Sequence, residues 1–262
     1  MTLGGAELEA LFGLARGWLP IAVLVFLRVG AAMWLMPAFG EQSVPMRVKT
    51  ALAFAFTAIC LPAVAGLYGP GPAGAAGWVR AAGAEVAAGL IFGFGLRFFT
   101  FALQIAGTIA AQSVSLSQIF GAGAGEPQPV IGHIFTISAL ALAAILGLHV
   151  QLAAYLILSW EMMPPGALPG GALVAQIGLQ EAGRMMATAF SLSAPFVLAG
   201  LAYQVVLGVI NRAMPQLMVT FVGAPAATAG GLILLFAVSP LLLSLWADAL
   251  FTFLGDPFGG AP

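Results

Sequence analysis

The feature that most constrains this chain is a series of six long apolar segments separated by short breaks. The segments are residues 18–39, 50–68, 83–120, 130–160, 187–210 and 217–250. Most of them match or exceed the length of about 20 apolar residues that a helix needs to cross a bilayer. Because a segment in lipid has to satisfy its own backbone hydrogen bonds, the sequence predicts an all-α membrane protein built from helical hairpins.

The overall composition agrees with a membrane protein. Of the 262 residues, 61% are hydrophobic and 6% are charged, and the mean hydropathy is +1.07. The net charge of −1 provides no basic face, which argues against binding to nucleic acid. A single cysteine, Cys60, excludes an intramolecular disulfide and a cysteine-based metal cluster. The first 17 residues do not resemble a cleavable signal peptide, so we expect none.

Two of the segments are too long for one straight crossing. Residues 83–120 would form a helix of about 57 Å, whereas a hydrocarbon core is about 30 Å thick. This segment either folds back near Gly93, Gly95 and Arg97 or forms one long helix that other subunits partly cover. Residues 217–250 pose the same problem, unless Pro225 and Pro240 kink or divide the helix. Two such segments suggest burial within an assembly.

Charged residues inside these segments should have partners. Arg28 lies ten residues into its apolar run, where an arginine costs roughly 2.5–3.5 kcal/mol on insertion scales. We expect an ion pair within the chain or between subunits, with Glu41, Glu85 or Glu161, or else an extension toward the head groups. Arg97 poses the same choice, and we favour a structural pair there.

Signals for catalysis are missing from the sequence. It contains no Gly-x-Ser-x-Gly or HExxH pattern, and its carboxylates are scattered. The stretch GAGAGEP at 121–127 lacks the Lys-Ser/Thr ending of a phosphate-binding loop. His149 stands alone in its run, whereas a proton relay needs several ionisable groups on one face. We therefore expect no enzyme activity, no cofactor and no metal.

Two of the breaks are candidates for functional segments. Gly121, Gly123 and Gly125 give the central break wide backbone freedom, so that it can line or block a passage or form an ordinary turn. The break NRAMPQ at 211–216 places several polar residues between apolar segments. It is either a basic turn that anchors two helices at the membrane surface or part of a functional surface.

Several blocks of the sequence resemble one known family. They are LRVGAAMWLMPAFGEQSVPMRVKTALA at 27–53, AEVAAGLIFGFGLRFFTFALQIAGTIAAQSVSLSQIFGAGAGEPQP at 84–129, LHVQLAAYLILSWEMMPPG at 148–166 and LGVINRAMPQLMVTFVGAP at 207–225. Over residues 16–250 the chain is similar to the FliR family of flagellar biosynthesis and its counterparts in type III secretion. It departs from the family pattern at Val114 and Glu126, which affects the shape of the central loop.

This resemblance implies a role as a subunit of the inner-membrane export gate of the flagellar basal body, through which unfolded flagellar proteins are exported. It implies FliP-type and FliQ-type subunits, an FlhB-type switch protein and an FlhA-type export protein as partners. Residues 1–170 would form a FliP-like part with a central plug loop, and residues 171–262 a FliQ-like hairpin. A virulence-type counterpart, or a small-solute secondary transporter, is the alternative.

The resemblance also assigns roles to individual residues. The expected plug or gating residues are Ser117, Gln118, Phe120, Gly121, Gly123, Gly125, Glu126 and Pro127. The expected cytoplasmic entrance and subunit contact consists of Asn211, Arg212, Pro215 and Gln216. The residues expected in intramembrane or inter-subunit ion pairs are Arg28, Glu85, Arg97 and Glu161.

Overall fold

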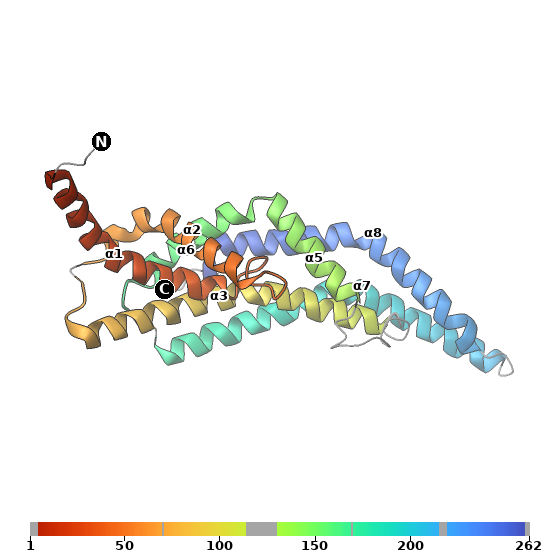
Figure 1. Cartoon of the computed structure of the whole chain (residues 1–262). Helices are drawn as coiled ribbons and strands as arrows, with labels where there is room; N and C mark the ends of the chain where they lie inside the picture. The colour runs from red at the N-terminus through yellow and green to blue at the C-terminus, as the bar shows by residue number, and fades with distance from the viewer. Residues whose placement is uncertain (1–4, 70, 114–129, 169, 215–218, 260–262) are drawn as a thin grey trace. The chain divides into compact units, whose positions relative to one another are not determined.

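Every regular element in the described part of the chain is a helix, as the apolar segments predict. The computed structural model describes residues 5–69, 71–113, 130–168, 170–214 and 219–259. The elements in chain order are α1 (Gly5–Met33), α2 (Met46–Val64), the 3-10 helix η1 (Ala65–Leu67), α3 (Gly74–Ser113), α5 (Val130–Ile145), α6 (Leu148–Met162), α7 (Gly171–Ala213), α8 (Val219–Gly255) and the 3-10 helix η2 (Pro257–Gly259) (Figure 1). The predicted all-α class is therefore confirmed for the described residues.

Several of these helices have the length and apolar character of membrane spans. Within the described residues, four stretches qualify: Met46–Leu67, Gly74–Ser113, Gly171–Ala213 and Pro225–Gly255. Helices α5 and α6 qualify together as a broken span, which brings the number to as many as five. The membrane character inferred from composition thus has a structural basis in individual helices.

The long third segment forms one helix over its described residues, 83–113. Helix α3 runs without interruption through 40 residues, which corresponds to a length of about 60 Å. The structure therefore selects the long helix over a hairpin near Gly93, Gly95 and Arg97. Pro225 and Pro240 likewise lie inside α8 without dividing it.

The fourth segment differs from the single run predicted over 130–160. Helix α5 ends at Ile145 and α6 begins at Leu148, with Gly147 between them at φ +88°. This left-handed conformation is the usual way in which a glycine ends a helix, because it carries no Cβ to clash with the preceding turn. Hydropathy alone does not detect the break, since Leu146 and Leu148 are as apolar as their surroundings.

The helices divide into two compact units. Unit 1 contains residues 1–97, 148–178 and 254–262, and unit 2 contains residues 98–147 and 179–253. Helices α3, α7 and α8 contribute residues to both units.

The core of unit 1 forms where α1, α2, α6 and the first part of α3 meet. Its fully buried side chains include Val25, Phe92, Tyr155 and Trp160. Tyr155 Oη donates a hydrogen bond of 2.8 Å to the carbonyl oxygen of Phe92, so the α6 hydroxyl is satisfied inside an apolar core. The rings of Phe92 and Tyr155 meet edge to face, with their centroids 5.6 Å apart.

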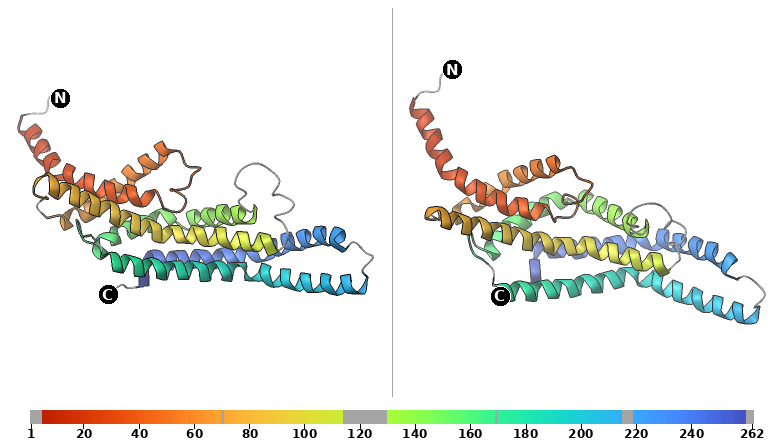
Figure 2. Two further views of the ribbon diagram at one scale, coloured as in Figure 1. Left: turned by 90° about the horizontal axis from the view of Figure 1, so that it is seen from below. Right: turned by 60° about the horizontal axis from the view of Figure 1, so that its bottom comes forward.

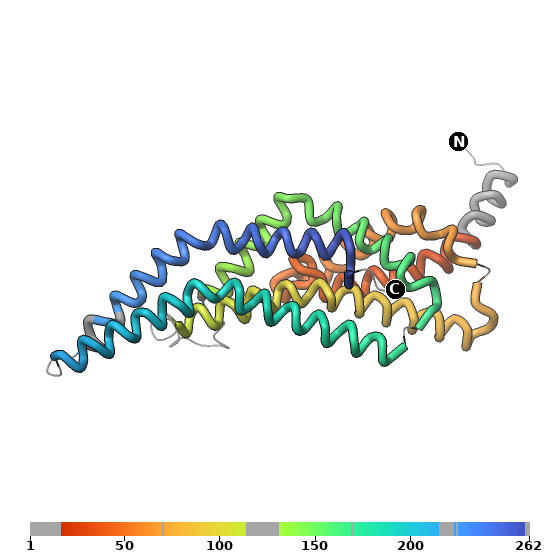
Figure 3. Tube along the Cα trace, turned by 180° about the vertical axis from the view of Figure 1, so that it is seen from behind, coloured from red at the N-terminus to blue at the C-terminus, as the bar shows by residue number. Residues whose placement is uncertain are grey.

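Unit 2 is organised around two antiparallel helices. The α7 and α8 portions of this unit run side by side in all views (Figures 2 and 3). Trp246 of α8 is fully buried and donates a 2.9 Å hydrogen bond from Nε1 to the carbonyl oxygen of Phe99 in α3. Helices α3 and α5 cross with their backbones in contact, because a Cβ on Gly107 would overlap Gly132.

Candidate functional site

A buried polar cluster in unit 1 is centred on Arg28. Arg28 Nε donates a hydrogen bond of 2.6 Å to Glu85 Oε2, and the side chains are 1% and 0% exposed. Arg28 Nη1 donates to the carbonyl oxygens of Ser159 and Met163, at 3.0 Å each. The Ser159 carbonyl also accepts a backbone hydrogen bond of 2.9 Å from Met163 N–H, whereas Met163 follows the last residue of α6, so Arg28 caps the end of α6 through the Met163 carbonyl.

Two aromatic residues extend this cluster. Arg28 Cζ lies 4.4 Å from the centroid of the Trp160 ring, which is cation–π distance. Trp160 Nε1 donates a 2.9 Å hydrogen bond to Tyr68 Oη. Burial raises the pKa of Tyr68, and the negative charge of Glu85 raises it further. Tyr68 therefore stays neutral at physiological pH.

Glu85 binds the connection that leads to α7 as well. Its second oxygen, Oε1, accepts a 3.1 Å hydrogen bond from the backbone N–H of Gly166. Gly166 itself has φ +69°, a conformation that favours glycine. One carboxylate thus joins Arg28 of α1 to the segment between α6 and α7.

Small residues allow α1 and α3 to approach closely enough for this pair. A Cβ on Gly89 would clash with the carbonyl oxygen of Arg28, and a Cβ on Gly93 would lie 2.7 Å from the carbonyl oxygen of Ala32. Glu85, Gly89 and Gly93 are spaced four residues apart and therefore lie on one face of α3. The same helix face supplies both the carboxylate and the close contact.

A second ion pair holds the connection between α1 and α2. Arg97 Nη1 donates a 2.7 Å hydrogen bond to Glu41 Oε1, and the side chains are 17% and 19% exposed. Lys49 Nζ donates to the carbonyl oxygen of Gly40 at 3.0 Å. Two of the carboxylates named for Arg28 therefore have different roles: Glu85 contacts it and Glu41 contacts Arg97. The third, Glu161, is exposed.

The expected entrance residues are described in part. Asn211 and Arg212 lie exposed in the last turn of α7, where a basic side chain is favourable near the helix C-terminus. Pro215 and Gln216 lie outside the described residues. The plug residues between Ser117 and Pro127 also lie outside them, in the segment that connects α3 to α5.

The sequence did not identify most partners of the Arg28 cluster. Ser159, Trp160 and Gly166 complete it, although no charge or metal-ligand pattern marks them. The family resemblance nevertheless pointed to this region, because all three residues lie in the block LHVQLAAYLILSWEMMPPG on which the resemblance rests. Across the described residues, no group of three or more His, Cys, Asp or Glu side chains is arranged to hold a metal ion.

Comparison with known proteins places this architecture in a family. The family described as bacterial export proteins, family 1, matches residues 19–253. The chain belongs to this family. The match includes both ion pairs and all four of the candidate membrane spans, apart from the last two residues of Pro225–Gly255.

Individual family members are similar to this chain over most of their length. The chain is 29% identical over 231 residues to the flagellar biosynthetic protein FliR of Caulobacter vibrioides, which covers 87% of this chain and 92% of the relative. It is 28% identical over 228 residues to FliR of Escherichia coli K12, with 86% of each chain covered. FliR of Bacillus subtilis is 27% identical over 221 residues, covering 82% of this chain and 85% of the relative.

Proposed function

We propose that this chain is a subunit of the inner-membrane export gate of a flagellar type III secretion apparatus. In this role it forms part of the channel through which unfolded flagellar proteins leave the cell, within the flagellar basal body. Its membership of the bacterial export family and its similarity to the FliR proteins support this assignment. The role is structural, and the energy for export comes from other components.

One structural observation carries the assembly part of this proposal. Helix α7 has 43 residues, which corresponds to about 65 Å, roughly twice the thickness of a hydrocarbon core. Leu198, Leu201, Val205 and Val209 form a stripe along it, and each is at least 60% exposed. A hydrocarbon core cannot contain the full length of this helix at any modest tilt, so part of α7 lies outside the core, where neighbouring subunits can cover its apolar side chains.

The partners follow from the family role. We assign FliP-type and FliQ-type subunits as neighbours in the gate, with an FlhB-type switch protein and an FlhA-type export protein beside it. Residues 1–170 correspond in this proposal to a FliP-like part, and residues 171–262 to a FliQ-like hairpin. The exposed apolar face of α7 provides a surface of the kind such neighbours require.

Two segments receive roles within the channel. Residues 117–127 act as the plug, because they connect two helices of an export-gate subunit and are rich in glycine. Asn211, Arg212, Pro215 and Gln216 act at the cytoplasmic entrance, where Arg212 is available to a carboxylate of a neighbouring subunit.

The alternatives receive less support. The relatives described above carry flagellar names, which favours a flagellar system over a virulence-type one. A small-solute transporter would be expected to belong to a transporter family with matching halves, whereas this chain belongs to an export family.

The decisive experiment is native mass spectrometry of the full chain, expressed with FliP-type and FliQ-type proteins of the same bacterium. We expect one copy of the chain in a large heteromeric complex. The control is the chain expressed alone. A monomer or small homo-oligomer in the presence of the partners would overturn the assignment. Restoration of motility in a strain that lacks its own FliR would test the function directly.

A further inference from the structure

The first helical hairpin contains a groove that the export role leaves unassigned. It lies in unit 1 between α1, the first half of α2 and one residue of α3, and its volume is about 330 Å³. This volume lies at the lower end of the range for small-molecule sites. Residues that define it include Phe26, Gly30, Trp34, Lys49, Ala53 and Val86.

The groove has an apolar end and a polar end. Phe26 lies about 10 Å along α1 from Met33, the last residue of the helix, and Trp34 follows directly after it. Phe26 stacks on Phe54 at the apolar end, with the ring centroids 4.6 Å apart. At the other end Trp34 is 58% exposed and Lys49 lines the opening. Tryptophan is enriched at the depth of the lipid head groups, so a membrane position with Trp34 at that depth would direct the apolar end of the groove toward the bilayer interior.

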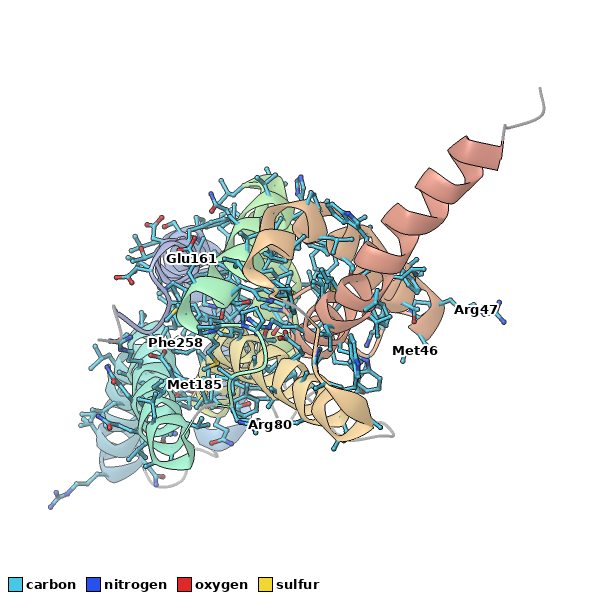
Figure 4. The ribbon with its side chains drawn as sticks, turned by 90° about the vertical axis from the view of Figure 1, so that its left-hand side faces the viewer. Met46, Arg47, Arg80, Glu161, Met185 and Phe258 are labelled. Atoms are coloured by element: carbon cyan, nitrogen blue, oxygen red, sulfur yellow. The ribbon has the colours of Figure 1, made fainter. Side chains whose placement is uncertain are left out.

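The polar end carries positive charge. Lys49 donates one proton to Gly40, and its ammonium group has two more to offer. Arg47, two residues before Lys49 on α2, does not line the groove; it is exposed and extends away from the ribbon (Figure 4). The first turn of α2 contains no acidic residue, and its N-cap, Pro45, provides no side-chain hydrogen bond. Glu41, the acidic residue closest in sequence, pairs with Arg97.

We propose that this groove binds an anionic phospholipid. Its phosphate lies at the ammonium group of Lys49, and one acyl chain runs past Gly30 and Ala53 toward Phe26. The charge at one end, the apolar lining beyond it and the position of α2 at the start of a candidate membrane span together match a phospholipid. A helix of another subunit would match the apolar part of the groove but not its basic end.

Open space beside Gly30 allows a larger side chain at this position to block the groove. A Cβ added at Gly30 would meet no atom within 4 Å, so the side chain of Gly30→Leu starts in open space in the groove. Gly83→Leu is the matched control, because Gly83 is exposed on α3, has the same open surroundings and does not line the groove.

The first test uses phosphatidylglycerol with a photoreactive acyl chain, added to the purified full chain in detergent. We expect cross-links to peptides covering residues 26–34 and 46–53. The Gly30→Leu variant should lose these cross-links and the Gly83→Leu variant should keep them. Cross-links that persist in Gly30→Leu, or that fall mainly outside the two peptides, would overturn the proposal.

The second test measures how much the positive charge contributes to lipid binding. It also replaces the first test if Gly30→Leu fails to fold. Native mass spectrometry gives the affinity of the full chain for phosphatidylglycerol and for phosphatidylcholine, which has no net charge. Lys49→Gln should weaken phosphatidylglycerol binding by about fivefold, and Arg80→Gln, which removes an exposed arginine elsewhere in unit 1, should not. Equal affinity for the two lipids, or an equal loss in Arg80→Gln, would contradict the proposal.

A third outcome separates lipid from protein. In the assembled complex with Thr50→Cys in the groove, cross-linking of this position to a neighbouring subunit at high yield would show that protein occupies the site. That result would overturn the lipid assignment and leave the export role intact, because the two rest on different residues.

Discussion

Arg28 Nε and Glu85 Oε2 lie 2.6 Å apart in a part of the molecule where neither side chain is more than 1% exposed. The pair joins α1 to α3, and through Ser159 and Gly166 it reaches the end of α6 and the segment before α7. A buried charge that loses its partner is costly, so this pair makes the arrangement of four chain segments depend on one contact.

Removal of one partner should therefore be more damaging than removal of both. Glu85→Leu leaves Arg28 charged and buried, and we expect a loss of about 3–5 kcal/mol in stability. The double variant Arg28→Met with Glu85→Leu should recover much of this loss, since no charge remains to be compensated. Thermal unfolding of the full chain in detergent measures the difference. A double variant less stable than Glu85→Leu alone would contradict this account.

The close contact between α1 and α3 gives a second prediction. Gly93→Val should destabilise the chain by at least about 1–3 kcal/mol, because the added Cβ would lie 2.7 Å from the carbonyl oxygen of Ala32 and the helices would have to separate. Gly83→Val on the same helix meets no atom within 4 Å and serves as the control. Equal melting temperatures for the two variants would show that the helices do not need this contact.

Tyr68 predicts a dependence of stability on alkaline pH. Its pKa is raised in the folded chain, so the unfolded chain releases the proton first as the pH increases. The contribution of this group to stability is complete below pH ~10 and declines above it. The melting temperature of the wild type should therefore fall more steeply above this pH than that of Tyr68→Phe. Parallel pH profiles would argue against the shift.

The entrance assignment predicts an effect of charge at Arg212. Arg212→Glu should reduce secretion of flagellar proteins while the complex still assembles, because it reverses the charge offered to a neighbouring carboxylate. Arg212→Lys keeps the charge and should retain most secretion. Secretion assays combined with native mass spectrometry separate export from assembly, and normal secretion by Arg212→Glu would exclude an essential charge here.

The plug assignment predicts a leak. Deletion of residues 121–125 should leave assembly unchanged and increase the passage of small solutes across the membrane. Influx of a small fluorescent solute into cells or vesicles that contain the complex measures this effect. An unchanged rate, with the complex present in normal amounts, would remove the plug role.

The helices were predictable where composition changes sharply. The stretches YGPGPAGAAG at 68–77 and MMPPGALPGG at 162–171 end helices with proline and glycine, and the structure has breaks at both. The start of α7 at Gly171 was not predicted from the apolar run 187–210. Gln180, Glu181 and Arg184 lower the hydropathy of its first turns, although such residues are compatible with a helix.

For the buried polar cluster, the sequence predicts only that Arg28 needs a partner. The position of Arg28 in an apolar run required a partner, but the sequence left Glu41, Glu85 and Glu161 open. The choice depends on how closely α1 approaches α3, which Gly89 and Gly93 decide through packing. The roles of Ser159 and Gly166 depend on where α6 ends, and that is a property of the folded chain.

The break between α5 and α6 at Gly147 places polar backbone groups within an otherwise apolar stretch. Leu146 and Gly147 donate hydrogen bonds back to the carbonyls of Leu142 and Ala144, which closes the end of α5. The first turn of α6 begins directly afterwards, and the leading N–H groups of any helix have no partner within it. Hydrocarbon cannot satisfy such groups. In a membrane, these N–H groups of α6 therefore need water or polar atoms of a neighbouring protein as hydrogen-bond partners.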